Sequence, residues 1–401
     1  MKDFELVIAG GGLTAARAVG SYREAGGDGR IALVTDERTL PYHRPPLSKK
    51  YLRGETTEAP IVEDAAFYAD NDVEVLLETA VTSVHPATRL VTTAQGPLRY
   101  EKLLIATGAT PRRLRVPGAE LEGVFSLRTL EDSQRIRAAA GRAERAVVVG
   151  GGFIGMEAAA SLRRLGLAVT LIHLGRGLFD ALGSPELSEQ LLDLYRERGV
   201  EVLLEEEVAR FGGGERLENV ETKSGRRATA DLAVVGVGVV PTTAFVEGSG
   251  LAIENGVVVN ERFQTTAPDV YAAGDVANFL DPLFGRQRRI EHWSNADYQG
   301  AEVGRILAGG DGGYDAVSSF FSEVFGTTVK VFGDVSHFDE AVTARTLESG
   351  LLVSYGDNGR LVGALAVGQS EEIESLAKEL IAERAAVRAL HDDLLVGGRA
   401  R

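Results

Sequence analysis

The sequence of 401 residues contains no cysteine. This absence excludes disulfide bonds, thiolate-ligated metal sites and iron–sulfur clusters held by the protein itself, and no other metal site is predicted. It also excludes a redox-active dithiol and a cysteine nucleophile. The length exceeds what one ordinary core accommodates, so we expect two or three domains.

Basic residues and long apolar runs are also scarce. The 43 Lys and Arg residues are outnumbered by 58 Asp and Glu, which gives a formal net charge of −15. Non-specific binding to nucleic acid needs an excess of cations, so the net charge argues against it and we expect no nucleic-acid partner. No apolar run approaches the ~18–20 residues of a membrane-spanning helix. A strand pattern begins almost at the first residue, so we expect no targeting segment and a cytoplasmic protein.

Two segments of the chain repeat the order strand, glycine turn, helix, strand. In the first, apolar residues 4–9 precede Gly10-Gly11-Gly12, and a helical stretch and a second apolar run follow at 13–25 and 30–34. In the second, the corresponding elements are 145–149, Gly150-Gly151-Gly152, 153–165 and 168–172. Such units open doubly wound α/β folds. Further buried strands are predicted at 102–106, 231–235 and 257–260.

The C-terminal part of the chain has a different pattern. Alternating residues at 329–334 and 350–355 predict antiparallel strands. Gly356-Asp357-Asn358-Gly359 is typical of a hairpin turn. Residues 371–391 carry apolar side chains at helical spacing, which predicts a closing amphipathic helix.

The first glycine motif, Gly10-x-Gly12-x-x-Ala15, indicates a dinucleotide site. Its first glycine permits a tight turn, its second lets the backbone approach a pyrophosphate, and its small third residue lets the helix pack on the strand. The helix N-terminus attracts phosphates. Glycine turns of this kind also occur without a ligand. Asp36, at the end of the next strand, favours the dinucleotide because its carboxylate can bind ribose hydroxyls.

The second motif, Gly150-x-Gly152-x-x-Gly155, has all three glycines. Two dinucleotide sites in one chain indicate two dinucleotides in contact, namely FAD and either NADH or NADPH. An acid at the end of the following strand would favour NADH, but His173 stands there, and Arg176 can contact either nucleotide. The preference between NADH and NADPH stays open.

Several further segments carry a family resemblance: Pro41-Tyr42-His43-Arg44-Pro45-Pro46-Leu47-Ser48-Lys49, Ala106-Thr107-Gly108, Tyr271-Ala272-Ala273-Gly274-Asp275-Val276-Ala277 and Glu291-His292-Trp293. With them the chain resembles the FAD-dependent NAD(P)H:ferredoxin reductases, of the putidaredoxin reductase and dioxygenase reductase type, which are related to apoptosis-inducing factor and monodehydroascorbate reductase. The resemblance implies two Rossmann-type, glutathione-reductase-like domains, with FAD at 1–110 and 244–312 and NAD(P) at 111–243, and a C-terminal α+β domain at 313–401.

The resemblance also implies roles for individual residues. The FAD site would comprise Gly10, Gly12, Ala15, Asp36, Arg44, Lys49, Val81, Ala106, Thr107, Gly108, Arg112, Asp275 and Trp293, with Asp275 at a helix N-terminus. The NAD(P) site would comprise Gly150, Gly152, Ile154, Gly155, Glu157, His173, Arg176, Gly238, Glu291 and His292. Lys49 would lie beside the flavin ring and pair with Glu157, and these two residues and Trp293 would be the catalytic ones.

Each of the catalytic assignments has a plainer alternative. A Lys–Glu pair can be a surface ion pair, worth under about 1 kcal/mol, and a single tryptophan is commonly a core or interface residue. His292 is given no acid–base role, because hydride transfer depends on the positions of the rings.

The predicted function is transfer of electrons from NAD(P)H through FAD to an external acceptor. Without cysteine, no dithiol can take them. The resemblance implies an acidic ferredoxin-like iron–sulfur protein, which would dock near Arg112, Arg113, Arg115, Arg286, Arg288 and Arg289. Alternatives are reduction of a small acceptor, such as an ascorbate radical or a quinone, and a redox-switched binding protein similar to apoptosis-inducing factor. Phe320-Phe321-Ser322 stands where the family usually has a further tryptophan, and the chain can be a monomer or a homodimer.

Overall fold

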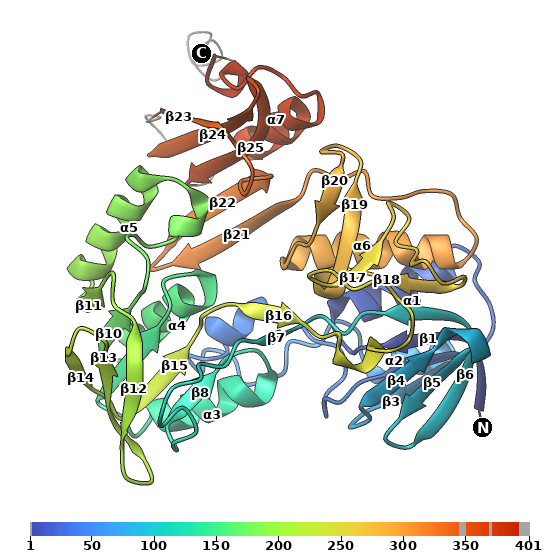
Figure 1. Ribbon diagram of the computed structural model, residues 1–401, viewed down its shortest axis with the longest axis horizontal. Coiled ribbons are helices and arrows are strands. Elements are labelled where there is room, and N and C mark those ends of the chain that lie inside the picture. Colours follow the sequence, from blue (N-terminus) through green and yellow to red (C-terminus); the bar gives the residue numbers. More distant parts are fainter. Residues whose placement is uncertain (1, 345–349, 369–370, 393–401) are drawn as a thin grey trace. The chain divides into compact units, whose positions relative to one another are not determined.

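The computed structural model describes residues 2–344, 350–368 and 371–392 (Figure 1). The chain forms two compact units, each built from three segments. The first unit contains Met1–His43, Ala59–Thr110 and Val239–Ala316, and the second contains Arg44–Glu58, Pro111–Gly238 and Val317–Arg401. The second unit therefore includes both the segment around Lys49 and the C-terminal sheet. The division into three domains expected from the sequence stays a prediction.

The first unit is built on a mixed sheet in which the strands follow the order β3-β2-β1-β6-β5-β4, and β18 also pairs with β6. Parallel strands are β1 (Lys2–Ala9), β2 (Ile31–Val34), β3 (Val73–Leu76), β6 (Gly96–Ile105) and β18 (Val270–Ala272); β4 (Val81–His85) and β5 (Leu90–Thr93) are antiparallel. The predicted strands at 4–9, 30–34 and 102–106 are confirmed. β2 is buried along its whole length, as central parallel strands are when both faces are covered.

Helices α1 (Leu13–Glu24) and α6 (Trp293–Leu307) of the first unit pack unusually close together. A Cβ atom at Gly304 would lie 2.5 Å from Ala18 O, and one at Gly300 would lie 2.7 Å from Thr14 O. The two glycines of α6 therefore let its backbone contact α1 directly. The remaining elements of this unit are α2 (Ala65–Asp70), η2 (Pro86–Thr88), β7 (Ala109–Pro111), β16 (Val239–Pro241), η4 (Ala244–Val246), β17 (Val257–Val259), η5 (Gly274–Val276), β19 (Ala277–Asp281) and β20 (Arg286–Arg288).

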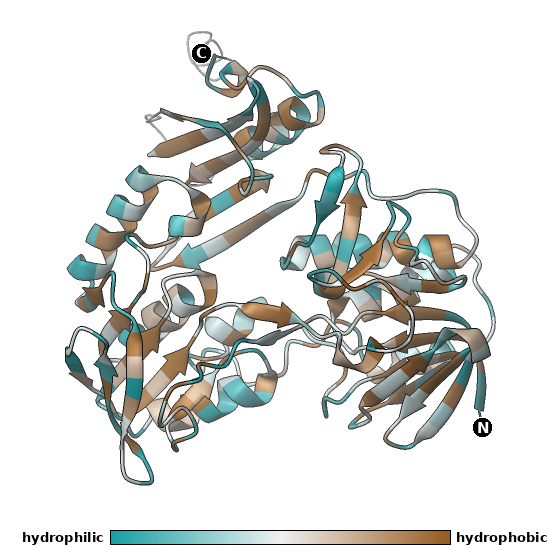
Figure 2. Ribbon diagram, in the orientation of Figure 1, coloured by the Kyte–Doolittle hydropathy of each residue, from teal (hydrophilic) through white to brown (hydrophobic). Residues whose placement is uncertain are grey.

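The second unit contains an all-parallel sheet in the order β11-β10-β9-β15-β8. Its strands are β8 (Val124–Ser126), β9 (Arg145–Val149), β10 (Ala168–Ile172), β11 (Val200–Leu203) and β15 (Leu232–Val235). Around it lie η1 (Pro45–Ser48), α3 (Leu130–Ala140), α4 (Phe153–Arg164), η3 (Asp180–Leu182), α5 (Pro185–Glu197) and the antiparallel strands β12 (Val208–Gly213), β13 (Leu217–Thr222) and β14 (Arg227–Thr229). The central strands are hydrophobic along their length, whereas α5 alternates hydrophobic and hydrophilic residues (Figure 2).

The C-terminal sheet of the second unit is antiparallel, as predicted. Its order is β21-β22-β25-β24-β23, formed by β21 (Ser319–Val324), β22 (Thr327–Gly333), β23 (Glu340–Ala344), β24 (Leu351–Asp357) and β25 (Arg360–Val367). Asn358 and Gly359 join β24 to β25 with φ of 52° and 73°. Both residues of this two-residue loop are left-handed, as a type I′ hairpin turn requires, and the predicted turn is confirmed.

The predicted closing helix is only partly correct. Helix α7 (Glu371–Ala382) starts where expected but ends well before residue 391. Arg384 is left-handed, with φ of 53°, and Ala386 then pairs with Arg360 at the edge of β25. Helical spacing of apolar residues continues beyond Ala382 in the sequence, but the backbone reversal ends the helix. Among the described residues, no helix combines the length and the hydropathy needed to cross a bilayer.

Candidate functional site

The first glycine motif has one glycine that the fold requires and one that faces open space. Gly10 has a φ of 122°, and a Cβ atom there would lie 2.2 Å from Ala106 O. A Cβ atom at Gly12 would meet no protein atom within 4 Å. Gly12 is thus not needed for packing, and the space beside its backbone suits a ligand that approaches the main chain. Ala15, at the third position, is completely buried in the packing of α1.

The carboxyl ends of the parallel strands of the first unit meet at one edge of its sheet. Gly10 follows β1, Asp36 follows β2, Ala106 follows β6, and Asp275 follows β18. Ligands of doubly wound sheets bind at this edge. Helix α1 begins there with no side-chain cap and no acidic residue in its first turn, which leaves its backbone N–H groups available to phosphate. These features fit the adenosine and pyrophosphate parts of FAD.

The family resemblance implied that Asp275 lies at the N-terminus of a helix, but the structure has no α-helix at this point. Asp275 lies within η5, a three-residue 3₁₀ turn (Gly274–Val276). Gln299 of α6 accepts a hydrogen bond from the Gly274 backbone N–H at 2.7 Å, and a Cβ atom at Gly274 would lie 2.5 Å from Thr14 Oγ1. The turn is therefore fixed by α1 and α6 rather than by a helix of its own.

Trp293 is the first residue of α6 and is 40% exposed. Its indole Nε1–H donates a hydrogen bond of 3.0 Å to His43 Nδ1. Burial, helped by the charge of Arg17, lowers the pKa of His43, which keeps that nitrogen free to accept. Trp293 is therefore not a core aromatic, so its role beside the flavin stays a prediction. Burial also lowers the pKa of His292 to about 4, so this residue is uncharged at neutral pH.

Two arginines of the predicted docking cluster are buried in ion pairs. Arg288 Nη1 lies 2.6 Å from Asp281 Oδ2, and the two side chains are 9% and 0% exposed. Arg289 pairs with Glu291, and its side chain is also 9% exposed. Their charges are neutralised inside the first unit, so the prediction that Arg288 and Arg289 present a charged surface is wrong.

The second glycine motif repeats the geometry of the first. A Cβ atom at Gly150 would lie 2.2 Å from Gly236 O, and one at Gly155 would lie 2.0 Å from Gly150 O. A Cβ atom at Gly152 would again meet no protein atom within 4 Å. Helix α4 starts at this point with no side-chain cap and no acid in its first turn. The residues present fit a second dinucleotide.

His173 at the end of β10 is held by the glycine loop itself. Its Nδ1 accepts a hydrogen bond of 3.0 Å from the Gly151 backbone N–H, and its Nε2 lies 3.4 Å from Asp180 Oδ1. Arg176, whose side chain is 92% exposed, lies 3.4 Å from Glu205. The end of β10 has no acidic residue of its own, but two carboxylates from later segments lie close to it: Asp180 beside His173, and Glu205 beside Arg176.

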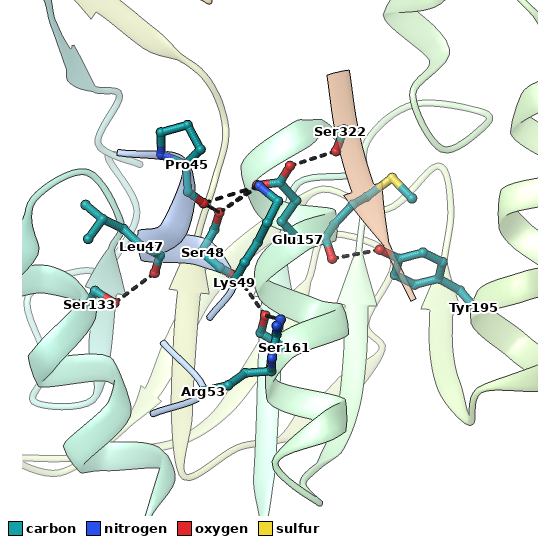
Figure 3. A network of polar contacts seen from close by, with 11 residues as sticks. Pro45, Leu47, Ser48, Lys49, Arg53, Ser133, Glu157, Ser161, Tyr195 and Ser322 are labelled. Atoms are coloured by element: carbon teal, nitrogen blue, oxygen red, sulfur yellow. Dashed lines mark hydrogen bonds and ion pairs between the residues drawn. The ribbon is translucent and has the colours of Figure 1, made fainter. Parts of the chain in front are cut away.

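Lys49 and Glu157 form a buried ion pair, with 2.5 Å between Lys49 Nζ and Glu157 Oε2 (Figure 3). Their side chains are 17% and 6% exposed. Ser48 Oγ donates a hydrogen bond of 2.6 Å to the same carboxylate oxygen, and Ser322 Oγ donates one of 2.7 Å to the other. This burial rules out a surface ion pair. Neither serine was predicted from the sequence to belong to the site, although Ser48 adjoins Lys49 in the family segment.

The remaining predicted residues are distributed over both units. The first unit holds Val81, Thr107, Gly108, Glu291 and His292, and the second holds Arg44, Arg112, Ile154 and Gly238. Arg44 donates a hydrogen bond of 2.8 Å to the Arg128 carbonyl, and Arg112 N–H bonds to Gly238 O at 2.9 Å. Ile154, in the first turn of α4, is 41% exposed. Among the described residues, no group of three metal-binding side chains gathers anywhere.

Comparison with known proteins identifies the family. Residues 4–300 match the pyridine nucleotide-disulphide oxidoreductase family. The chain is 35% identical to the 5,5′-dehydrodivanillate O-demethylase ferredoxin reductase subunit of Sphingobium sp., over 93% of this chain and 92% of that protein. The ferredoxin reductase for the CYP199A2 system from Rhodopseudomonas palustris has the same fold, with a TM-score of 0.90 and 30% identity over 96% of each chain. The covalent putidaredoxin reductase–putidaredoxin complex matches with a TM-score of 0.92 and 30% identity, over 100% of this chain and 99% of that one.

The chain therefore belongs to the pyridine nucleotide-disulphide oxidoreductase family. Its similarity to ferredoxin reductases over nearly the whole length confirms the resemblance stated from the sequence, and the predicted two-nucleotide α/β fold is confirmed with it. The protein is an oxidoreductase that uses FAD and a nicotinamide dinucleotide.

We predict that Gly152→Val weakens NADH binding at least about tenfold, a loss above 1.4 kcal/mol, because the new side chain fills the open space beside the loop. The substitution meets no protein atom, so the melting temperature of the FAD-loaded protein should stay within about 2 °C of wild type. Calorimetric titration with NADH and thermal unfolding measure the two quantities.

Gly155→Val serves as the contrasting variant, since its side chain would collide with the Gly150 carbonyl and should lower the melting temperature. If Gly152→Val binds NADH as tightly as wild type, the dinucleotide does not approach the chain at this glycine.

Proposed function

We propose that this protein is the reductase of an electron-transfer chain, which passes electrons from NADH through FAD to a small iron–sulfur protein. The observation that carries the proposal is the complete absence of cysteine in a member of a family named for disulphide reduction. No dithiol can take electrons, so they must leave for an external acceptor. FAD, when bound, supplies the needed chemistry, because it accepts two electrons as one hydride and can release them one at a time.

The names of the relatives support this acceptor. A 3-phenylpropionate/cinnamic acid dioxygenase ferredoxin–NAD⁺ reductase component is 32% identical over 95% of this chain, and putidaredoxin reductase is 32% identical over 94%. One similar structure is a reductase joined to its own putidaredoxin. We extend this partner class, a ferredoxin-like protein, to the present chain.

We propose that the protein's own residues bind and orient the two cofactors. The backbone beside Gly12 and the N-terminus of α1 would hold the FAD pyrophosphate, and Asp36 its ribose. The Lys49 ammonium would stabilise negative charge on the reduced flavin, and Glu157 would hold that ammonium in place. Trp293, held by His43, would restrict the position of the rings.

The surroundings of His173 favour NADH over NADPH. A 2′-phosphate carries a charge of about −2, and Asp180 and Glu205 would repel it at short range. Arg176 follows His173 closely in the sequence, but it lies within ion-pair distance of Glu205. A ribose hydroxyl can instead donate a hydrogen bond to a carboxylate. Arg176 alone would therefore not make the site select NADPH.

We propose that an acidic iron–sulfur protein docks at Arg112, Arg113 and Arg115. All three are exposed and follow β7 directly, whereas the side chains of Arg288 and Arg289 are only 9% exposed. Exposed charges steer association and raise its rate at low ionic strength. The cytoplasmic location and the choice between monomer and homodimer stay predictions.

Anaerobic stopped-flow absorbance tests the proposed function. We expect NADH to bleach the FAD-loaded protein much faster than NADPH does, and the reduced protein to transfer electrons rapidly to a ferredoxin. A reduced flavin that no ferredoxin reoxidises, but that a quinone or ascorbate radical does, would replace the iron–sulfur acceptor by a small one. Slow oxidation by every acceptor, together with NADH-induced dimerisation, would favour a redox-switched binding protein.

We predict that the double substitution Arg113→Glu, Arg115→Glu slows ferredoxin reduction at least about tenfold at low salt, because it reverses the charge that attracts an acidic partner. The effect should shrink as salt is raised. Flavin reduction by NADH, measured in the same instrument, should not change.

Arg142→Glu is the matched control, since Arg142 is also an exposed arginine of the second unit. It should leave ferredoxin reduction within about twofold of wild type. Equal rates for the double variant and wild type at low salt would place the docking surface elsewhere.

A further inference from the structure

Strand β21 of the C-terminal sheet packs against helix α4 in matching register. Ser322 and Val324 are buried, whereas Phe321 and Glu323 between and beside them are exposed. On the side of Ser322, Phe320 meets Phe153 edge-to-face at 5.0 Å between ring centres, and Ser322 meets Glu157. Residues two positions apart along a strand and residues four positions apart along a helix are both separated by about 6–7 Å. Phe320 and Ser322 can therefore contact Phe153 and Glu157, respectively, at the same time.

Glu157 is a buried carboxylate whose two oxygens receive donors from separate segments (Figure 3). Oε2 is bound by Lys49 Nζ and Ser48 Oγ, which belong to two consecutive residues at the end of η1. Oε1 is bound by Ser322 Oγ at 2.7 Å, and among the described residues this hydroxyl is its one donor. A buried carboxylate oxygen without a hydrogen-bond donor raises the free energy of the folded protein, so the carboxylate rotates towards any other donor within reach. Ser322 thus restrains the half of the carboxylate that Lys49 does not reach.

The helix around Glu157 is fixed by other hydrogen bonds, so the carboxylate itself is what Ser322 can orient. Tyr195 of α5 donates a hydrogen bond of 2.7 Å to the Met156 carbonyl, and Ser161 Oγ donates one of 2.6 Å to the Ser48 carbonyl. The backbone of α4 and the start of the Lys49 segment are therefore tied together. The side-chain torsions of Glu157 still require a restraint at the far oxygen.

We propose that Ser322 is a positioning residue of the reductase, which holds the Glu157 carboxylate in the orientation that pairs with Lys49. The C-terminal sheet would thereby contribute one side chain to the reaction, although Ser322 touches neither cofactor in this account. The proposal rests on the proposed function, because it matters for catalysis only if the Lys49–Glu157 pair acts on the flavin.

The kinetic test is a double-mutant cycle on the rate of FAD reduction by NADH. Ser322→Ala should slow reduction about tenfold, which corresponds to 1.4 kcal/mol and to the loss of one hydrogen bond to a charged group. In a Glu157→Ala background the same substitution should change the rate by less than about twofold, since the carboxylate that it orients is gone. Equal effects in both backgrounds would overturn the proposal.

The structural readout does not depend on activity. Crystal structures of the wild-type and Ser322→Ala proteins should show the Glu157 carboxylate in one orientation in the former and in a rotated or divided position in the latter. The Lys49 Nζ to Glu157 Oε2 contact of 2.5 Å should lengthen in the variant. An unchanged carboxylate and an unchanged contact would overturn the proposal, whatever the kinetics show.

Ser354→Ala is the matched control. Ser354 is a buried serine of β24 in the same sheet, and its hydroxyl has no hydrogen-bond partner within the part of the chain that the structure describes. Its removal should leave both the rate and the Glu157 position unchanged. If Ser354→Ala slows reduction as much as Ser322→Ala, the effect is one of sheet stability and the proposal fails. Wild-type protein that NADH does not reduce would instead reject the proposed function, a different outcome from rapid wild-type reduction with an unaffected Ser322→Ala variant.

Discussion

In each unit, the backbone that follows one parallel strand, β1 or β9, passes so close to the end of a neighbouring strand that a side chain cannot fit between them. A Cβ atom at Gly10 would lie 2.2 Å from the Ala106 carbonyl oxygen, and a Cβ atom at Gly150 would lie 2.2 Å from the Gly236 carbonyl oxygen. This constraint sets where α1 and α4 begin and aims their uncapped N-termini along the carboxyl edge of each sheet. The glycine two residues later, Gly12 or Gly152, is then left beside open space. Tight packing at one residue and open space two residues later are the two features that a dinucleotide-binding turn requires.

The second physical constraint on the structure is a buried charge. A carboxylate such as that of Glu157 is stable in the interior only when cations and hydroxyls replace its water shell. Lys49, Ser48 and Ser322 do so from two segments that lie far apart in the sequence. Arg288 and Asp281 form a comparable buried pair in the first unit. In both cases the fold determines which charges are available to a partner and which are neutralised internally.

The sequence predicted the elements that depend on local pattern. Strand ends, glycine motifs and the Asn358-Gly359 hairpin follow from spacing and residue type, and the structure has them at the expected places. The burial of Arg288 was missed because its partner Asp281 comes from the neighbouring strand of the β19–β20 hairpin. The bond between Ser322 and Glu157 spans 165 residues, and no short-range pattern predicts it. The end of α7 was missed because a left-handed residue, Arg384, interrupts an otherwise helical pattern.

The central claim is that electrons pass from the flavin directly to an external acceptor, because the sequence contains no cysteine that could form a second, disulfide redox centre. An anaerobic titration of the FAD-loaded protein with NADH tests this claim directly. About one equivalent of NADH per flavin should bleach the FAD absorbance completely, and further additions should leave free NADH in solution. Consumption of a second equivalent would reveal another electron-accepting group and contradict the account, as would a flavin that NADH does not reduce.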